Sequence, residues 1–406
     1  MDRIISWILF FMILSSSCTG HMNGQQRRMA DEPVAILPGA WQTQKYFPLL
    51  EGKKLALLGN HSSLIAGVHL ADSLLNAGFA LEKVFSPEHG FRGQAAAGEQ
   101  VQSGVDVQTG LPVISLYGAH RRPEAKDLEG IDLVIFDIQD VGARFYTYIS
   151  TMSYMMEEAA RMGIPMLILD RPNPNGHYVD GPIREEKHAS FVGLHPIPLV
   201  HGMTVAEYAQ MVNGQGWLGD GLVCELHIVP VANYNRNMWY ELPVAPSPNL
   251  PNMTSIMLYP GLCMFEGTEI SLGRGTDFPF QVFGHPALPP EFFPFTFTPE
   301  SRSAAPNPPQ KGNRCFGRDM RTDNPQQLHS LARFDIGPLL EAYAHFPQKE
   351  EFFNNFFSRL AGTDELKQQI IAGWSENEIR ATWQSGLEAF RQMRKPYLIY
   401  PDTDQP

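Results

Sequence analysis

The segment SPEHGFRG, residues 86–93, places a carboxylate, an imidazole and a guanidinium close together directly after the apolar run 81–85. Glu88 stands between Pro87 and His89, at the expected end of a buried strand. A carboxyl that is partly desolvated there can keep its proton near neutrality and donate it to a leaving group. Glu88 is therefore a candidate proton donor. The same residue could instead cap the next turn or pair with Arg92.

A second group of chemically capable side chains occurs in EGTEISLGRGTDFPF, residues 266–280. Glu266, Glu269 and Arg274 stand among glycines, which let a loop approach a ligand closely. Two carboxyls on either side of a glycosidic bond can supply the acid and the base or nucleophile that its hydrolysis needs. Glu266 is the preferred partner of Glu88, although each could also be a solvated loop residue.

Further polar groups follow the strands expected at 132–137 and 165–170. Asp140, Arg144 and Tyr146 lie in DIQDVGARFYTY, and Arg171 and Asn173 lie in DRPNPNG. An arginine of this set could grip a substrate carboxylate, while the tyrosine could stack on a sugar face. Asp140 and Arg144, four residues apart, could equally pair on the first turn of a helix.

Histidines raise the question of a metal. His61 follows Asn60 after the first expected strand, and His89 and His201 are the other candidates. No HExxH or similarly fixed spacing accompanies them, so we predict no metal. Buried, hydrogen-bonded histidines are the expected alternative, and these residues are kept as candidate ligands of a substrate.

Short apolar runs alternate with amphipathic segments from Lys54 onward. Continuous apolar strands separated by helices predict a parallel sheet covered on both faces, an α/β, Rossmann-like domain. The polar groups above would then gather at the carboxyl edge of the sheet, where such folds bind ligands. No GxGxxG follows the first strand and no GxxxxGK[ST] occurs, so no nucleotide cofactor is predicted. Strands are expected at 54–59, 81–85, 112–117, 132–137 and 165–170, and helices at 68–77 and 145–162.

The domain organisation follows from length and proline content. The 406 residues exceed what one core usually organises. The proline-rich segment 242–253 marks the expected junction between a Rossmann-like domain, 34–245, and a smaller α+β domain, 246–406. Thr204 could cap a helix that runs to about Asn213, and helical spacing recurs at 364–371 and 376–393.

Residues 1–33 are expected to be a signal peptide and tether. Arg3 precedes the apolar run Ile4–Leu14, and serines then precede Cys18. The run is shorter than the roughly 20 residues that span a bilayer, which is typical of a secretion signal. We expect Cys18 to be lipidated, giving an exported lipoprotein of the periplasm or cell surface. Ordinary cleavage near the serines is the alternative.

Charge and cysteine content exclude several other classes. The formal net charge of -12 argues against a nucleic-acid partner, because that affinity comes from clustered lysines and arginines. Cys224, Cys263 and Cys315 show no paired spacing, so neither a disulfide scaffold nor a zinc site is expected. They are expected to be buried small hydrophobes.

Six ordered motifs together resemble one family, the exo-β-N-acetylmuramidases of glycoside hydrolase family 171, formerly a domain of unknown function. The resemblance covers about residues 35–402. It implies an active site in a cleft between two domains and release of N-acetylmuramic acid from non-reducing ends of peptidoglycan fragments. The motifs are GNHSS (59–63), SPEHGFRG, DIQDVGARFYTY, DRPNPNG (170–176), LVHGMTVAEYA (199–209) and YPGLCMFEGTEISLGRGTDFPF (259–280).

The resemblance also implies residue roles. The family glutamate of the EHG motif falls on Glu88, and its FEGT glutamate falls on Glu266. Glu88 would protonate the glycosidic oxygen, while Glu266 would act as nucleophile, as water-activating base, or as orienter of the substrate acetamido group. After EGT the family commonly has Asn where this chain has Glu269, an extra carboxylate that could alter sugar contacts.

Muramic acid carries a lactyl carboxylate, and the arginines proposed as its partner are Arg144, Arg171 and Arg274. Two other classes stay open from the sequence. One is a surface lipoprotein that binds cell-wall fragments without cleaving them. The other is a metal-assisted hydrolase of amide or ester bonds.

Overall fold

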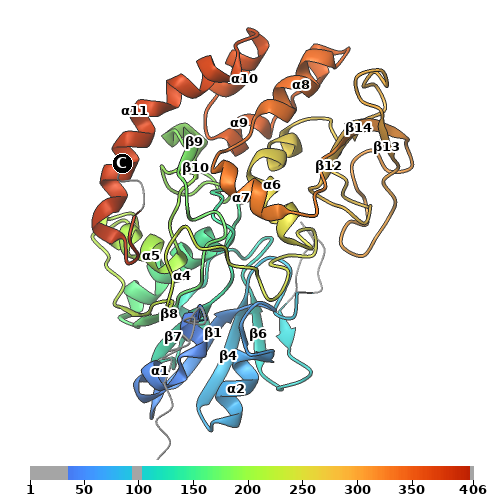
Figure 1. The fold of residues 1–406 in the computed structure, drawn as a ribbon. Helices are drawn as coiled ribbons and strands as arrows, with labels where there is room; N and C mark the ends of the chain where they lie inside the picture. The colour runs from blue at the N-terminus through green and yellow to red at the C-terminus, as the bar shows by residue number, and fades with distance from the viewer. Residues whose placement is uncertain (1–34, 94–102, 403–406) are drawn as a thin grey trace, which may run out of the picture. The chain divides into compact units, whose positions relative to one another are not determined.

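A seven-stranded sheet forms the centre of the N-terminal half of the chain (Figure 1). The computed structural model describes residues 35–93 and 103–402, and the residues from Ile36 onward belong to one unit. Neighbouring strands pair in parallel except β5, which pairs antiparallel with β6. In spatial order the strands are β11 (Leu226–Val229), β8 (Met166–Leu169), β7 (Leu133–Asp137), β1 (Lys54–Gly59), β4 (Ala80–Ser86), β6 (Pro112–Ser115) and β5 (Gly104–Val105).

This order confirms the predicted α/β class. Counted from β6, the parallel strands run β6-β4-β1-β7-β8-β11, which is the 3-2-1-4-5-6 order of the doubly wound fold. The chain adds strands first on one side of β1 and then, from β7 onward, on the other side, so the strand order switches between β1 and β7. Ligands of such folds bind beyond the carboxyl ends of the strands, so the loops that follow these strands deserve most weight in locating a site.

Both faces of the sheet are buried, as the continuous apolar strands predicted. In β1, Leu55 and Leu57 point into one core cluster, while Ala56 and Leu58 point into the other. This alternation is the period of two of a β-strand. The first cluster includes side chains of α1 (Thr43–Leu50) and α2 (Leu70–Asn76), and the second includes side chains of α4 (Tyr148–Met162) and α5 (Val205–Gly214).

Helix α5 begins as expected. The Thr204 hydroxyl accepts a hydrogen bond from the Glu207 backbone N–H, and the Glu207 carboxylate accepts one from the Thr204 N–H. Two other predicted starts were early. Residues 68–69 form β3 (Val68–His69), which pairs with β2 (Leu64–Ile65), and His69 caps α2. Residues 142–147 turn before α4 instead of continuing it.

The C-terminal part is the smaller α+β domain that we predicted. It holds an antiparallel sheet in the order β12-β14-β13 and several helices. The position of the boundary near residue 245 stays a prediction. The strands are β12 (Val282–His285), β13 (Phe295–Phe297) and β14 (Cys315–Asp319), and the helices are α6 (Met253–Leu262), α7 (Pro325–Leu331), α8 (Gly337–His345), α9 (Phe357–Ala361), α10 (Glu365–Ile371) and α11 (Glu376–Arg394).

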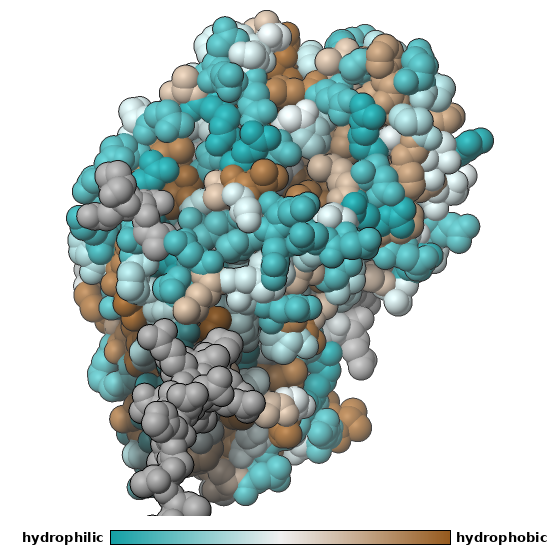
Figure 2. Space-filling model, viewed as in Figure 1, coloured by the Kyte–Doolittle hydropathy of each residue, from teal (hydrophilic) through white to brown (hydrophobic). Residues whose placement is uncertain are grey.

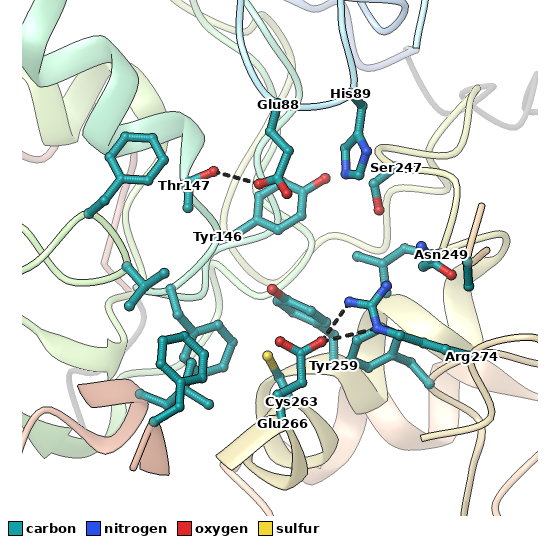
Figure 3. Close-up of a pocket in the computed structure, with 18 of the residues that line it drawn as sticks. Glu88, His89, Tyr146, Thr147, Ser247, Asn249, Tyr259, Cys263, Glu266 and Arg274 are labelled. Carbon is teal, nitrogen blue, oxygen red and sulfur yellow. Dashed lines mark hydrogen bonds and ion pairs between the residues drawn. The ribbon is translucent and has the colours of Figure 1, made fainter. Parts of the chain in front are cut away.

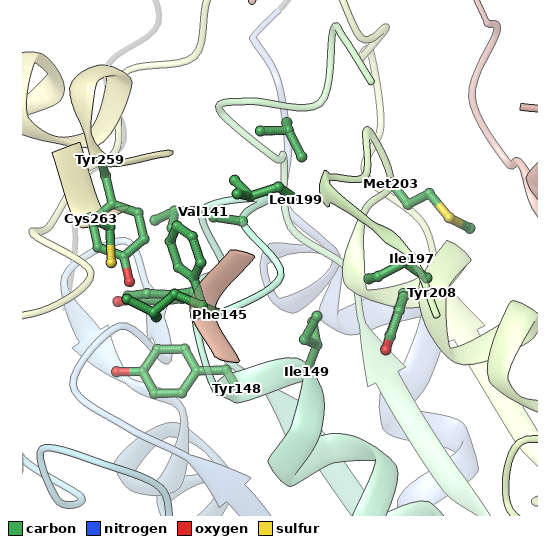
Figure 4. Packing of buried hydrophobic residues seen from close by; sticks show 14 of the residues in the cluster. Val141, Phe145, Tyr148, Ile149, Ile197, Leu199, Met203, Tyr208, Tyr259 and Cys263 are labelled. Carbon is green, nitrogen blue, oxygen red and sulfur yellow. The ribbon is translucent and has the colours of Figure 1, made fainter. Parts of the chain in front are cut away.

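One hydrophobic core joins this part to the sheet. Phe145, which precedes α4, packs edge-on against Tyr259 of α6 with ring centroids 5.4 Å apart (Figure 4). Helix α11 packs against β9 (Asp180–Ile183), which pairs antiparallel with β10 (Pro198–Val200). The short helix α3 (Ala125–Leu128) completes the set of helices in the described residues. The two halves are thus fixed to each other by shared packing.

Hydrophilic side chains cover most of the face drawn in Figure 2. Among the described residues, no helix has both the length and the apolar character needed to cross a bilayer. The predicted signal peptide, tether and lipidation site Cys18 lie outside the described residues. Cys224, Cys263 and Cys315 are free and buried, as expected.

Candidate active site

A pocket of about 750 Å³ opens beyond the carboxyl edge of the sheet, and both halves of the chain line it. Glu88 comes from the loop after β4 and Glu266 from the segment after α6. Figure 3 shows the two carboxyls reaching into the same space from opposite sides. A volume of this size is typical of pockets that enclose a small-molecule ligand.

The loop that carries Glu88 is a tight turn. The Gly90 N–H donates to the Pro87 carbonyl over 3.1 Å, and His89 adopts the left-handed conformation with φ of +71°. A side chain other than glycine pays for that conformation, and such strain often marks functional sites. Gly93 ends the turn at φ of +70°, where a Cβ would lie 2.3 Å from the His61 ring. The glycine at position 93 of the EHGFRG segment is therefore required sterically, because a larger side chain would collide with His61.

Two hydroxyls hold the Glu88 carboxyl. Tyr117, two residues beyond β6, donates to one oxygen over 2.8 Å, and Thr147, directly before α4, donates to the other over 3.2 Å. Burial raises the pKa of the Tyr117 phenol, and the negative charges of Glu88 and, more weakly, Glu266 raise it further. Both carboxylates therefore act on one phenol, which agrees with their convergence on one pocket.

Glu266 is placed by α6 and the 3₁₀ turn η3 (Cys263–Gly267). The Asn252 side chain accepts from the Ser255 N–H and starts α6, and the Asn354 amide donates to the Glu266 carbonyl over 3.2 Å at the far end. The Arg274 guanidinium donates to one Glu266 carboxylate oxygen over 2.6 and 3.1 Å. The carboxylate is thus held on a short, fixed segment.

The pair between Glu266 and Arg274 is mostly buried, with side-chain exposures of 30% and 19%. Burial alone would lower the pKa of Arg274, but the charge and hydrogen bonds of Glu266 outweigh that effect and raise it. The guanidinium therefore stays charged beside the Glu266 carboxylate. Glu88, by contrast, accepts from the neutral hydroxyls of Tyr117 and Thr147. Two carboxyls in different surroundings are what acid and base or nucleophile roles require.

Of the predicted substrate-contacting residues, His89, Tyr146 and Arg274 line this pocket with Glu88 and Glu266. The Tyr146 hydroxyl donates to the Pro246 carbonyl over 3.0 Å, which fixes its ring in the wall. The other predicted residues are not among those that line the pocket in the described part of the chain. They are Asn60, His61, Arg92, Asp140, Arg144, Arg171, Asn173, His201 and Glu269.

The structure buries Arg144 and Arg171 and places neither among the residues that line the pocket, so it gives no support to the predicted contact with a substrate carboxylate. Arg144 is 1% exposed and donates to the backbone carbonyls of Pro182, Ile197, Leu360 and Ala361. Arg171 is 3% exposed and pairs with Asp137 over 2.6 and 2.9 Å. Neither guanidinium can reach a ligand without breaking these contacts.

The polar residues at the ends of β1 and β7 also serve the fold. Asn60 accepts from the Ser62 N–H, and its carbonyl receives a hydrogen bond from His69. Asp140 accepts from the Gly142 N–H over 2.6 Å, and burial raises the pKa of this carboxyl to about 7. A Cβ at Gly142, where φ is +78°, would lie 2.3 Å from Asn173.

Asn173 donates to the Met203 carbonyl over 2.9 Å and links its motif to the segment before α5. The imidazole of His61 contacts the Ala245 carbonyl over 2.7 Å. The imidazole of His201 is 1% exposed, and burial lowers its pKa to about 3. Buried histidines were the alternative that we stated for this set.

Arg92 and Glu269 lie elsewhere for different reasons. Arg92 pairs with Asp106 over 2.7 Å and with Asp72 over 3.4 Å. Its anticipated partnership with Glu88 is therefore replaced by two aspartates. Glu269 is exposed and lines a smaller cavity of about 420 Å³ behind Glu266 and Arg274. Its carboxylate is not in the main pocket.

Several lining residues were missing from the sequence-based list. Tyr117 stood at the end of an expected strand, and Thr147 and Tyr259 stood inside motifs, so position alone could have flagged all three. Others had no comparable signal, since they arrive from loops and from a short helix. These are Arg121, Phe191, Val192, Ser247, Asn249, Phe356, Arg359 and the segment Ala304–Pro309. Among the described residues, no three His, Cys, Asp or Glu side chains are grouped so as to hold a metal ion.

A doubly wound α/β domain whose strand-edge pocket presents two carboxyls in unlike surroundings defines a candidate glycoside hydrolase. Comparison with known proteins makes this specific. Models of the N-terminal and C-terminal parts of exo-β-N-acetylmuramidase NamZ match residues 55–254 and 257–400. The chain therefore belongs to the exo-β-N-acetylmuramidase NamZ family.

Individual relatives agree. The chain is 37% identical over 372 residues to the peptidoglycan β-N-acetylmuramidase NamZ of Bacillus subtilis (strain 168), covering 87% of this chain and 89% of that protein. A crystal structure of a DUF1343 family protein of Bacteroides fragilis NCTC 9343 has 44% identity and a TM-score of 0.84, and covers 91% of this chain and 100% of that one. A second protein of that family and strain has 27% identity and a TM-score of 0.77, with coverages of 90% and 99%.

Proposed function

We infer that this protein is an exo-acting glycoside hydrolase that releases N-acetylmuramic acid from the non-reducing ends of peptidoglycan fragments. The observation that carries this conclusion is the shared pocket of Glu88 and Glu266 in a chain of the NamZ family. The B. subtilis relative, aligned over most of both chains, is named as a peptidoglycan β-N-acetylmuramidase. Muramyl saccharides are accordingly the substrate class.

In the proposed mechanism, Glu88 donates a proton to the glycosidic oxygen as the bond to the leaving sugar breaks. The Tyr117 hydroxyl, 2.8 Å away, orients the carboxyl. The Thr147 contact is longer, at 3.2 Å, and is the one that a protonated carboxyl would exchange for the glycosidic oxygen. Tyr117 and Thr147 are positioning residues in this scheme, since they act through Glu88.

Glu266 would stabilise the positive charge that develops at the anomeric carbon. Arg274 holds this carboxylate through a hydrogen bond of 2.6 Å, and a carboxylate so placed can act as a nucleophile, as a base that activates water, or as a group that orients the substrate acetamido nitrogen. All three roles require a carboxylate on the face opposite the proton donor. The placement of the two carboxyls on opposite sides of the pocket supports this division of labour.

We also propose that the protein is exported and held at a membrane through a lipid on Cys18. The support is the order of Arg3, the apolar run Ile4–Leu14 and the serines before Cys18. An extracytoplasmic location suits an enzyme whose substrate is the cell wall, and the acidic net charge of -12 disfavours nucleic acid as a partner. Cys18→Ser should move the protein from the membrane fraction to the soluble fraction.

The test of the function is incubation with a chromogenic β-N-acetylmuramide, with and without a chelator. Release that the chelator leaves unchanged is the expected result. No release, with retained binding of muramyl fragments, would identify the non-catalytic lipoprotein instead. Release that the chelator abolishes would identify a metalloenzyme and overturn the two-carboxylate mechanism.

A further inference from the structure

The pocket is cationic although the chain is acidic. Its lining includes the arginines Arg121, Arg274 and Arg359 against the two glutamates Glu88 and Glu266, an excess of one positive charge with His89 neutral. The chain as a whole carries -12. A pocket whose charge opposes that of its own protein favours a ligand of negative charge.

Two of the three arginines form no ion pair with a carboxylate in the part of the chain that the structure describes. Arg274 is committed to Glu266. Among residues 35–93 and 103–402, no ion pair forms at Arg121 or Arg359, whereas Arg92 and Arg171 each pair with an aspartate. Their charge is therefore available to a ligand in the pocket.

Arg121 lies near the Glu88 end of the pocket. Its guanidinium sits over the ring of Phe191, 4.8 Å from the centroid, and Phe191 itself lines the pocket. This contact limits the conformations of an exposed side chain, so less entropy is lost when it binds an anion. The positive charge also reaches Tyr117, where it opposes the effect of burial on the phenol pKa.

Arg359 lies on α9 between Phe356 and Leu360, which both line the pocket. The position of α9 is fixed from beneath, because Arg144 donates to the carbonyls of Leu360 and Ala361 over 2.9 and 2.7 Å. The buried arginine thus secures the wall from which the exposed one projects. An anchored wall is what a binding residue on a short helix needs.

We propose that Arg121 and Arg359 bind the lactyl carboxylate of muramic acid and thereby select anionic sugars over neutral ones. The proposal rests on the inferred muramidase function. A guanidinium presents several N–H donors in a fixed fork and binds a carboxylate more strongly than it binds a neutral group. The role that the sequence assigned to Arg144 and Arg171 passes to two arginines that the pocket exposes.

The test compares 4-nitrophenyl β-N-acetylmuramide with the same compound whose lactyl carboxyl is converted to the primary amide. Enzymes are the wild type, Arg121→Gln, Arg359→Gln and the double variant. The wild type should prefer the acid in kcat/KM by about tenfold to hundredfold, the range for a hydrogen-bonded charge. Each single variant should reduce this ratio, and the double variant should bring it close to one.

Matched controls are Arg122→Gln and Arg314→Gln. Arg122 is the chain neighbour of Arg121 but pairs with Glu157 and sits over Tyr154, and neither control residue lines the pocket. Both controls should keep the wild-type ratio. Arg121→Lys keeps the positive charge but loses the forked arrangement of N–H donors, so it should retain part of the wild-type preference for the acid.

A second pair of substrates carries a peptide on the lactyl group. In one compound the carboxyls of the peptide are free, and in the other they are amidated. A wild-type preference confined to this pair would overturn the lactyl assignment and point to the peptide. A double variant that keeps the wild-type preference for the lactyl acid would overturn the role of the arginines. Failure of the wild type to cleave any muramide would instead refute the proposed function.

Discussion

Replacing Glu88 by Gln separates proton donation from every other role of this residue. The glutamine oxygen can accept from one of the hydroxyls of Tyr117 and Thr147, and its amide can donate to the other. A neutral hydrogen bond is worth about 0.5–1.5 kcal/mol, and the glutamine keeps both bonds with a neutral group. We therefore expect the free energy of unfolding to change by about 1 kcal/mol or less, with the fold retained.

The expected effect on catalysis is much larger. General acid catalysis contributes about 10²–10⁴ in rate, which corresponds to about 3–5 kcal/mol of activation free energy. Glu88→Gln should lose this factor on a natural disaccharide, whose leaving sugar needs a proton. A dinitrophenolate leaves without protonation, so on a 2,4-dinitrophenyl muramide the same variant should lose about tenfold or less.

The assay is kcat/KM on both substrates for the wild type, Glu88→Gln and Glu266→Gln. A nucleophile, base or orienting group is needed whatever the leaving group, so Glu266→Gln should lose a similar factor on both. Equal losses for Glu88→Gln on both substrates would refute its role as proton donor. Near-normal turnover of the disaccharide by this variant would remove Glu88 from the mechanism altogether.

Three further predictions concern the framework of the site. The lysine in Arg144→Lys cannot donate to all four carbonyls that the guanidinium reaches. Each unsatisfied buried group costs about 1–3 kcal/mol, so chemical denaturation should show a loss of about 3 kcal/mol in unfolding free energy. An unchanged denaturation midpoint would contradict the structural role of Arg144. Gly93→Ala should lower the free energy of unfolding by about 2 kcal/mol or more and reduce turnover, because φ is +70° and the new Cβ would meet His61. The control Gly110→Ala, at φ of +74° with open space around it, should lower the free energy of unfolding by about 1 kcal/mol and leave turnover unchanged. Equal effects of the two substitutions would exclude the contact with His61 as the cause. Hydrogen bonds from Arg92 lower the pKa of Asp106 to about 2, so the stabilising contribution of the Asp106 carboxylate is present above about pH 4 and is lost as the pH falls towards 2. The difference in unfolding free energy between the wild type and Asp106→Asn, measured by urea denaturation, should therefore shrink over that interval. A constant difference would argue against the ion pair.

The sheet could be predicted because its strands are buried on both faces. Burial on both faces leaves a continuous apolar run, as in residues 133–136, and the five expected strands all appear in the sheet. Strand β11 was missed, since Leu226–Val229 is an edge strand of intermediate burial that contains His227. A polar residue in a short edge strand interrupts the pattern that identified the others.

The catalytic candidates could be located because the motifs around them carry steric information. A positive φ at His89 and Gly90 and the close approach of Gly93 to His61 restrict the residues of the turn. The boundary of α4 could not be located in the same way. Residues 145–147 have the apolar spacing of a helix, but the rings of Phe145 and Tyr146 pack against Tyr259, a contact that depends on a segment more than a hundred residues away.

The choice among the arginines shows where sequence reasoning stops. Arg144 and Arg171 follow strands at the ligand-binding edge, which made them the natural partners for a substrate carboxylate. In the structure Arg171 pairs with Asp137 at the end of β7, Arg144 is surrounded by backbone carbonyls, and neither arginine lines the pocket. An arginine next to a strand end is thus recruited to lock the strand ends together, because a buried guanidinium must satisfy its donors locally. Arg121 and Arg359 stand on a loop and a short helix without a motif, and only the folded chain shows that they line the pocket and form no ion pair among the described residues.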